Sequence, residues 1–251
     1  EFKAQLLKIK TILIERNQSL YLDELEALLI KVNLFGFHFA SLDIRQNSKI
    51  HDAVFKDVVQ FYLNSNSNLF PNNYFELSEN EKFDVLAKVK GNINSDVFDN
   101  EITRSTLESI KAIKQIQENN GESGSNRYII SNNESALNVM ETFALFKLNN
   151  WDEISVDIIP LFESVDDLKN AHVIMEKLYS NPVYVEYLAS RNNKQVIMLG
   201  FSDGTKDGGY WMANWSIYKA KEELTSMSRK YGIKVIFFDG RGGPPARGDG
   251  K

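Results

Sequence analysis

The sequence predicts a helix-rich α/β fold built on a parallel sheet. Short apolar runs alternate with helical patterns along the chain, and charged motifs lie at or just beyond the ends of four of the runs. Alternating strands and helices are typical of a parallel sheet, in which the carboxyl ends of the strands meet at one edge. We therefore expect the charged residues to share one rim. The alternative is a set of ordinary strand-to-helix turns with polar caps, which four successive charged motifs disfavour.

Five short apolar runs are the predicted strands. The first ends at Arg45, the third at Glu163 and the fifth at Asp239, whereas the fourth stops at Gly200. The second carries no charged motif at its end. The predicted strands are residues 37–44, 128–131, 158–162, 196–199 and 234–238.

Helical patterns account for most of the remaining chain. Ser78 and Ser164 open two of them with capping-box spacing, and Pro182 stands near the start of another. Polar stretches with glycine or proline, residues 64–73 and 119–126, are expected to be loops inserted in one domain. The predicted helices are residues 1–17, 21–34, 49–63, 78 to near 91, 101–118, 135–148, 164–179, 182–188 and about 210–231.

The fourth strand leads into a polar turn, residues 202–209, and then into the last helix. That helix is expected to carry Trp211, Trp215 and Tyr218 on one face. Asp203 and Lys206 lie three residues apart in the turn. A carboxylate and an ammonium group where a buried strand meets a helix N-terminus suit anion or metal chemistry.

Composition excludes several classes of protein. A net charge of −5 over 251 residues argues against a nucleic-acid surface, and this length allows one large domain. The absence of cysteine excludes disulfides and thiolate metal sites. No apolar run approaches a membrane span and no signal peptide opens the chain, so we expect a cytoplasmic protein. Because the chain opens in a helical pattern and closes in a glycine-rich loop, we expect a piece of a longer polypeptide.

Four motifs in one order give the chain a resemblance to a known family. They are Leu42-Asp43-Ile44-Arg45-Gln46, Pro160-Leu161-Phe162-Glu163, Gly200-Phe201-Ser202-Asp203 with Lys206-Asp207, and Gly240-Arg241-Gly242-Gly243 with Arg247-Gly248. With these motifs in register over nearly its whole length, the chain resembles bacterial phosphoenolpyruvate carboxylase. The resemblance implies that residues 1–251 are the central part of a helix-rich (β/α)₈ barrel of the phosphoenolpyruvate-binding type, with the N-terminal and C-terminal parts missing.

The resemblance also implies an activity. The family joins phosphoenolpyruvate and bicarbonate into oxaloacetate and phosphate, which feeds the tricarboxylic acid cycle, and it uses Mg²⁺ or Mn²⁺. In the family reaction, bicarbonate attacks the phosphoryl group to give carboxyphosphate and the enolate of pyruvate. Carboxyphosphate then releases CO₂, and the enolate captures it. The family enzyme is usually a homotetramer with effectors such as aspartate or malate. We expect carboxylation by the full-length protein and none by this chain alone.

By the same resemblance, Glu163 and Asp203 are the metal ligands. A hard divalent cation takes oxygen ligands, and one or two protein carboxylates leave positions for substrate oxygens. The two residues are expected close together, at the ends of adjacent or near-adjacent strands. The alternative for each carboxylate is a helix cap.

Three arginines match anion-binding residues of the family, and a guanidinium offers a planar fork of permanent charge. Arg45 matches the arginine that contacts the phosphate or carboxyphosphate group. Arg241 matches a catalytic arginine of the glycine-rich loop, and Arg247 matches the second one, which also links to the inhibitor site. The alternatives are a surface ion pair for Arg45, for example with Asp43, and a basic tail for the other two.

Glycines and one lysine complete the predicted site. Gly240, Gly242 and Gly243 would let backbone amides approach a phosphate. Lys206 is a candidate catalytic residue that could equally position the loop or pair with a carboxylate.

The chain departs from the family pattern in the glycine-rich loop and in its histidines. The departures in the loop are Asp239, Pro244, Pro245 and Asp249. The family's general base is a histidine in the N-terminal part, outside this chain. We expect the three histidines present, His38 in a strand and His51 and His172 in helices, to be structural or solvated.

Two other functions stay open at this point. One is a non-catalytic regulatory module that binds phosphoenolpyruvate or another anion, and the other is a different phosphoenolpyruvate-using barrel enzyme. The Arg45-Gln46 pair and the doubled Gly-Arg loop favour the carboxylase. A histidine motif upstream in the full gene would distinguish the carboxylase from the module.

Overall fold

The computed structural model describes residues 1–65 and 67–240, and the chain divides into two compact units. The first unit comprises Glu1–Leu42 and Lys114–Asn126. The second comprises Asp43–Ile113 and the chain from Arg127 onward. The second unit contains every strand of the sheet described below.

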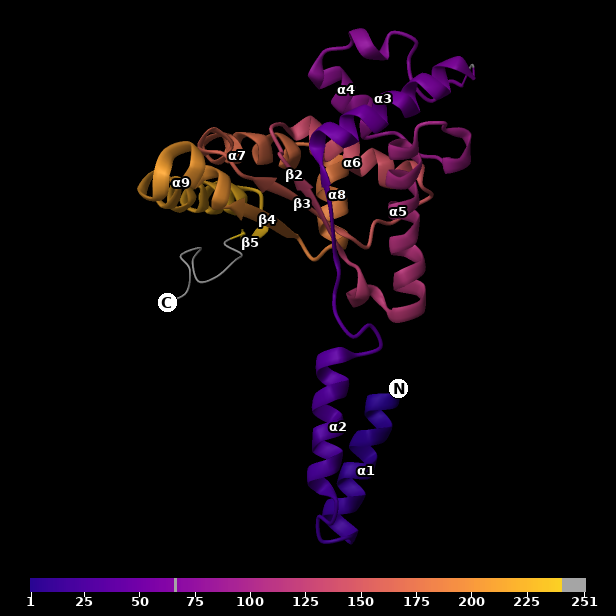
Figure 1. Ribbon diagram of the computed structural model, residues 1–251, viewed down its shortest axis with the longest axis vertical. Coiled ribbons are helices and arrows are strands. Elements are labelled where there is room, and N and C mark those ends of the chain that lie inside the picture. Colours follow the sequence, from indigo (N-terminus) through magenta and orange to yellow (C-terminus); the bar gives the residue numbers. More distant parts are fainter. Residues whose placement is uncertain (66, 241–251) are drawn as a thin grey trace. The chain divides into compact units, whose positions relative to one another are not determined.

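Five parallel strands form one sheet in the order β1-β2-β3-β4-β5, which is also their order along the chain (Figure 1). This order is that of a sheet wound in one direction, as in a barrel, and differs from a doubly wound sheet. No pairing joins β1 to β5 in the described part of the chain, so barrel closure stays a prediction. The strands are β1 (Asp43–Asn47), β2 (Arg127–Ser131), β3 (Asp157–Phe162), β4 (Lys194–Gly200) and β5 (Lys234–Gly240).

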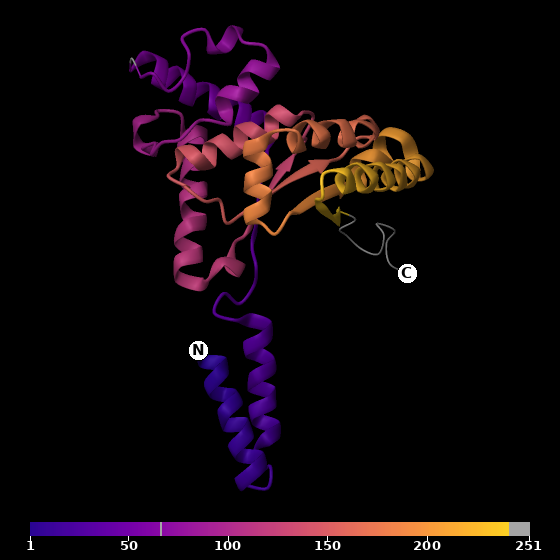
Figure 2. The same cartoon turned by 180° about the vertical axis from the view of Figure 1, so that it is seen from behind.

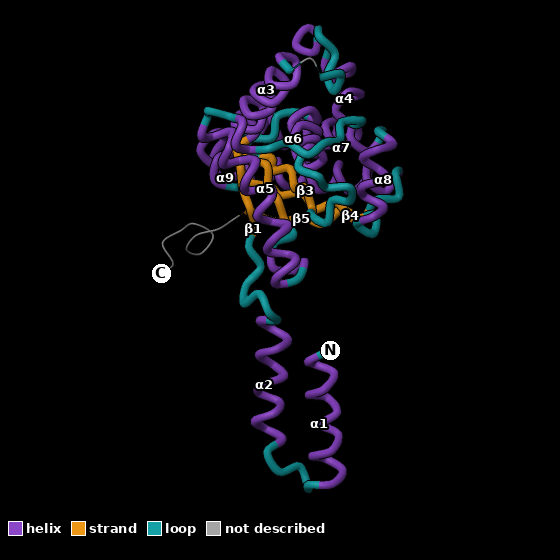
Figure 3. Tube along the Cα trace, turned by 90° about the vertical axis from the view of Figure 1, so that its right-hand side faces the viewer, coloured by secondary structure: helices purple, strands orange, loops and turns teal. Residues whose placement is uncertain are grey.

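Helices follow the strands of the second unit and cover one face of its sheet (Figures 2 and 3). The predicted helices are confirmed, and most of their ends are shifted by a few residues. Helix α4 was expected to reach Gly91 and ends at Leu86, and α9 begins at Ser202, ahead of its expected start near residue 210. The helices are α3 (Ser48–Asn64), α4 (Glu79–Leu86), α5 (Glu101–Asn120, through Ile113 in this unit), α6 (Ala136–Leu148), α7 (Val165–Tyr179), α8 (Pro182–Ser190) and α9 (Ser202–Lys230).

Strand residues alternate between two apolar clusters because successive side chains point to opposite faces of a sheet. Tyr128 and Ile130 face the helices and join the main core. The other face carries a smaller cluster built from strands alone: Ile129, Ile159, Leu161 and Val196, with Met198 and Phe238 against them. Burial on both faces is typical of a parallel sheet.

The first unit is organised around a helical hairpin. Helices α1 (Phe2–Arg16) and α2 (Leu22–Phe35) pack through Leu6, Leu25 and Leu29. No helix in the described residues combines the length and the apolar character that crossing a membrane requires.

The predicted first strand is wrong for residues 37–42. There the backbone closes α2: the Phe39 N–H donates to the Phe35 carbonyl at 2.8 Å, and both Gly36 and Phe39 have positive φ. His38 therefore lies in a turn and not in a strand. The strand itself begins only at Asp43.

The predicted polar turn 202–209 is instead the first part of α9. The Thr205 N–H and hydroxyl both donate to the Phe201 carbonyl, at 3.0 and 2.7 Å, which starts the helix early. The break comes at Gly209, whose φ of 78° lies outside the helical region. Beyond it, Trp211 and Trp215 lie on the exposed face of the helix.

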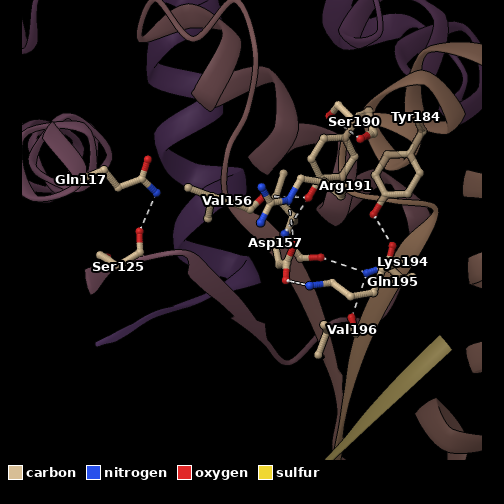
Figure 4. Close-up of polar contacts among 12 residues, drawn as sticks. Gln117, Ser125, Val156, Asp157, Tyr184, Ser190, Arg191, Lys194, Gln195 and Val196 are labelled. Atoms are coloured by element: carbon tan, nitrogen blue, oxygen red, sulfur yellow. Dashed lines mark hydrogen bonds and ion pairs between the residues drawn. The ribbon is translucent and has the colours of Figure 1, made fainter. Parts of the chain in front are cut away.

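Asp157 at the start of β3 is the centre of a buried ion cluster (Figure 4). Its side chain is 7% exposed, and its two oxygens accept from Arg191 Nε and Lys194 Nζ, each at 2.9 Å. Beside it, the Tyr187 hydroxyl accepts from the Ile158 N–H at 2.9 Å. This cluster ties the start of β3 to the segment that enters β4.

Glu141 on α6 is a buried carboxyl group with a perturbed pKa. Its Oε2 has no hydrogen-bond partner among the described residues. Burial, and then the nearby charge of Asp52, raise the pKa of Glu141 from 4.5 to about 8. Since the folded state holds this proton more tightly than the unfolded state, the group lowers stability progressively as the pH rises from about 4.5 to about 8, and the full cost persists above that.

We therefore expect Glu141→Gln to raise the free energy of unfolding by about 1–3 kcal/mol at pH 9, because an amide avoids the buried charge. Near pH 4 the two proteins should differ little, since the carboxyl is protonated in both the folded and much of the unfolded state. Urea unfolding at both pH values measures the effect. An equal difference at the two pH values would contradict the titration of Glu141.

Candidate functional site

The carboxyl ends of the strands form one rim of the sheet, and this rim carries the predicted site residues that the structure describes. Glu163 directly follows β3, and Asp203 lies in the first turn of α9, just after β4. Because β3 and β4 are paired neighbours, the two carboxylates follow adjacent strands, as predicted. Arg45 lies on β1, and Gly240 ends β5.

The Glu163 carboxylate is held at both oxygens. Arg45 Nη2 donates to Oε1 at 2.9 Å, and the backbone N–H of Asn132 donates to Oε2 at 2.8 Å. The Glu163 side chain is 18% exposed, whereas Arg45 is 51% exposed. Gly200 leaves room for this arrangement, because a Cβ there would lie 3.1 Å from both Cα and Cγ of Glu163. The rim thus fixes one carboxylate beside one arginine.

Arg45 pairs with Glu163 and not with Asp43. The Asp43 carboxylate instead forms an ion pair with Arg127, whose Nε lies 2.8 Å from Oδ1. Arg45 and Asp43 both belong to β1, but only Arg45 reaches across β2 to the end of β3. The suggested Arg45–Asp43 pair is therefore wrong, and the guanidinium lies at the rim.

Asp203 and Lys206 pair with each other within one turn of α9. The Lys206 Nζ lies 2.8 Å from Asp203 Oδ1, and both side chains are exposed. Pairing with a carboxylate is one of the alternatives given above for Lys206. An exposed ion pair contributes at most about 1 kcal/mol, so a ligand can separate these two groups at little cost.

The start of α9 is joined to the start of α7 by two contacts that sequence reasoning missed. The Val165 N–H donates to Asp207 Oδ2 at 3.4 Å. At Gly204, an added Cβ would lie 3.5 Å from the Glu163 carbonyl oxygen. These contacts bring the Asp203 turn beside the backbone of Glu163.

The predicted glycine-rich loop is described only at its first residue. Gly240 pairs with Gly200, and a Cβ on Gly240 would lie 3.0 Å from Met198 Cε and 3.1 Å from the Leu199 carbonyl oxygen. Close packing against β4 therefore leaves little space for a side chain here. The remaining predicted residues of this loop, Arg241, Gly242, Gly243 and Arg247, lie outside the described residues, as do the departures Pro244, Pro245 and Asp249.

None of the histidines joins the rim residues in the described contacts. His51 is buried, and its ring nitrogens lie 2.9 Å from the Tyr128 hydroxyl and 3.0 Å from the Thr142 hydroxyl. Burial lowers the pKa of His51 to about 4, so the ring is neutral at neutral pH. The structural role predicted for His51 is confirmed. His172 Nδ1 lies 3.1 Å from Glu223.

The oxygen donors of the rim suit a hard divalent cation. Glu163 and Asp203 supply two carboxylates from neighbouring strand ends. Within residues 1–65 and 67–240, no three His, Asp or Glu side chains gather into a complete metal site. Mg²⁺ typically takes one or two protein carboxylates and completes its shell with water and substrate oxygens. The donor set therefore fits Mg²⁺ or Mn²⁺.

The chain is similar to proteins of one known family. The family model for phosphoenolpyruvate carboxylase matches residues 1–251. The chain is 38% identical over 229 residues to the phosphoenolpyruvate carboxylase of Nitrosomonas eutropha, an alignment that covers 87% of this chain and 24% of that protein. The chain thus spans about a quarter of the length of the curated relative that it matches.

Proposed function

Because the chain belongs to the phosphoenolpyruvate carboxylase family, we propose that the polypeptide it belongs to converts phosphoenolpyruvate and bicarbonate into oxaloacetate and phosphate. The observation that carries the proposal is the contact between Arg45 and Glu163. It brings an arginine suited to a phosphate and a carboxylate suited to a divalent cation to the same rim. Both substrates are anions, and this reaction needs both kinds of group.

In this proposal each rim residue has a separate task. Glu163 and Asp203 hold Mg²⁺ or Mn²⁺, and the cation supplies charge stabilisation for substrate oxygens when it is bound. Arg45 orients the phosphoryl group, and Lys206, once apart from Asp203, adds positive charge beside an anionic substrate. These groups act by positioning and by electrostatic stabilisation, and the proton-accepting base is a histidine outside this chain.

The glycine-rich loop belongs to the same proposal through the family resemblance. Arg241 and Arg247 stabilise the bound anions, and Gly240, Gly242 and Gly243 let backbone amides approach a phosphate. The homotetramer, regulation by aspartate or malate and the cytoplasmic location are likewise implied by the family.

We also propose that residues 1–251 are the central part of a (β/α)₈ barrel. Five parallel strands in sequential order support this, and so does the apolar sheet face made from strands alone. In such a barrel, that face would be the interior and the rim would be the catalytic end.

The test compares the full-length polypeptide with this chain. Each is given phosphoenolpyruvate, bicarbonate and Mg²⁺, and oxaloacetate is coupled to malate dehydrogenase and NADH. We expect NADH consumption by the full-length protein only when all three are present. We expect none by this chain, because it lacks the base and leaves its charges open to water. Turnover by the chain alone would show that the base is misplaced. Binding without turnover by the full-length protein would favour a regulatory module.

A further inference from the structure

We propose that Asn132 is a positioning residue that orients Glu163 for the cation. The inference rests on the proposed function, in which Glu163 is a cation ligand. Its contact is made by the main chain: the Asn132 N–H donates to Glu163 Oε2 at 2.8 Å. The residue follows β2, whose end carries no charged motif. Nothing in the four site motifs therefore points to it.

The Asn132 peptide is presented by an unusual backbone conformation. Its φ is 54°, in the left-handed region that non-glycine residues seldom adopt and that asparagine tolerates best. On one side, the Asn132 carbonyl accepts from the Ser48 hydroxyl. On the other, its side-chain amide donates to Glu134 Oε1 at 2.9 Å. The turn is therefore braced from both directions.

The two donors to Glu163 differ in how easily they can leave. Arg45 is a long and half-exposed side chain, so its guanidinium can turn to a substrate anion. The Asn132 N–H belongs to a braced turn and stays in place. When Arg45 moves, Oε2 remains fixed by a charge-assisted hydrogen bond, and Oε1 is left for the cation. The cation then meets a carboxylate whose orientation is already set.

This arrangement predicts which substitutions matter. Glycine at position 132 adopts the same φ without strain, so it keeps the N–H directed at Glu163. Valine is β-branched and disfavours positive φ strongly, so it turns the peptide away. Loss of the side-chain contact with Glu134 is common to both variants and cancels in their comparison.

The experiment measures Mn²⁺ binding to the full-length protein by electron paramagnetic resonance, without substrate. We expect Asn132→Gly to bind within about twofold of the unaltered protein, and Asn132→Val to bind about tenfold more weakly, a typical loss for a residue that orients a ligand. Circular dichroism shows whether each variant folds. If Asn132→Val does not fold, Asn132→Ala applies a smaller strain and should give a smaller loss of the same sign.

Glu163→Gln and the double variant Asn132→Val with Glu163→Gln complete the test. If Asn132 acts through Glu163, the double variant should bind no more weakly than Glu163→Gln alone. Equal affinities of the glycine, the valine (or alanine) and the unaltered proteins would overturn the positioning role, and so would additive losses. Unchanged Mn²⁺ affinity in Glu163→Gln would instead remove Glu163 as a ligand, which is a failure of the proposed function.

Discussion

Replacing Glu163 by glutamine in the full-length protein is expected to lower turnover of phosphoenolpyruvate and bicarbonate by about 100-fold or more, which is about 2.7 kcal/mol or more of transition-state stabilisation. Glutamine has nearly the same shape, and its carbonyl can still accept from Arg45 or from the Asn132 N–H. The negative charge is lost, however, and a hard cation depends on that charge. Coupled oxaloacetate formation measures the rate, and Mn²⁺ binding measures the site.

Asp166→Asn is the matched control for this change. Asp166 lies three residues after Glu163 in the first turn of α7, its side chain is 85% exposed, and its ion pair is with Lys169 at 3.4 Å. We expect the Asp166→Asn enzyme to keep turnover within about twofold of the unaltered enzyme, since exposed pairs contribute little. Retention of full turnover by Glu163→Gln would show that Glu163 is not needed by the reaction.

The strands could be predicted because most of their apolar runs are bounded by glycine or by a charged residue. The prediction was wrong where a similar apolar run forms the end of a helix instead of a strand. Residues 37–42 are rich in apolar side chains, but the N–H groups beyond Phe35 close the end of α2 instead of pairing with a strand. Local periodicity cannot separate these two uses of an apolar run, because the deciding hydrogen bonds are those of a helix end.

The prediction for the start of α9 was wrong for a related reason. Residues 202–209 contain three glycines and read as a turn. In the structure only Gly209 leaves the helical region, whereas Gly204 lies in the helix against the backbone of Glu163. A glycine count therefore does not show which glycine breaks the helix, because the backbone conformation of each one depends on the fold around it.

The candidate site could be predicted in its residues but not in its contacts. The positions of Glu163 and Asp203 just after predicted strands placed both residues at one edge of the sheet, since parallel strands bring their carboxyl ends to one edge. The contact between Arg45 and Glu163 joins residues 118 positions apart, across the intervening β2. Asn132 was missed because it acts through its N–H, a group that every residue except proline carries.

The contacts of the Asp157 cluster, which stabilise the fold, could not be predicted from the sequence either. Sequence reasoning placed the third strand but gave no reason to single out the residue before its apolar run. The partners Arg191 and Lys194 lie in the segment between α8 and the start of β4, and only the fold brings them to one carboxylate (Figure 4). Such a cluster is sensitive to loss of Asp157, because this carboxylate pairs with two positive charges.

Asp157→Ala is therefore expected to lower the free energy of unfolding by about 3 kcal/mol, within the range for removing one partner of a buried ion pair. The change deprives Arg191, which is nearly buried, and Lys194 of this carboxylate. Urea unfolding at pH 7 measures the loss. Asp166→Ala is the matched control, because it removes an exposed carboxylate from a lysine pair and should cost less than about 1 kcal/mol. Equal losses in the two variants would show that the Asp157 cluster contributes no more than a surface pair.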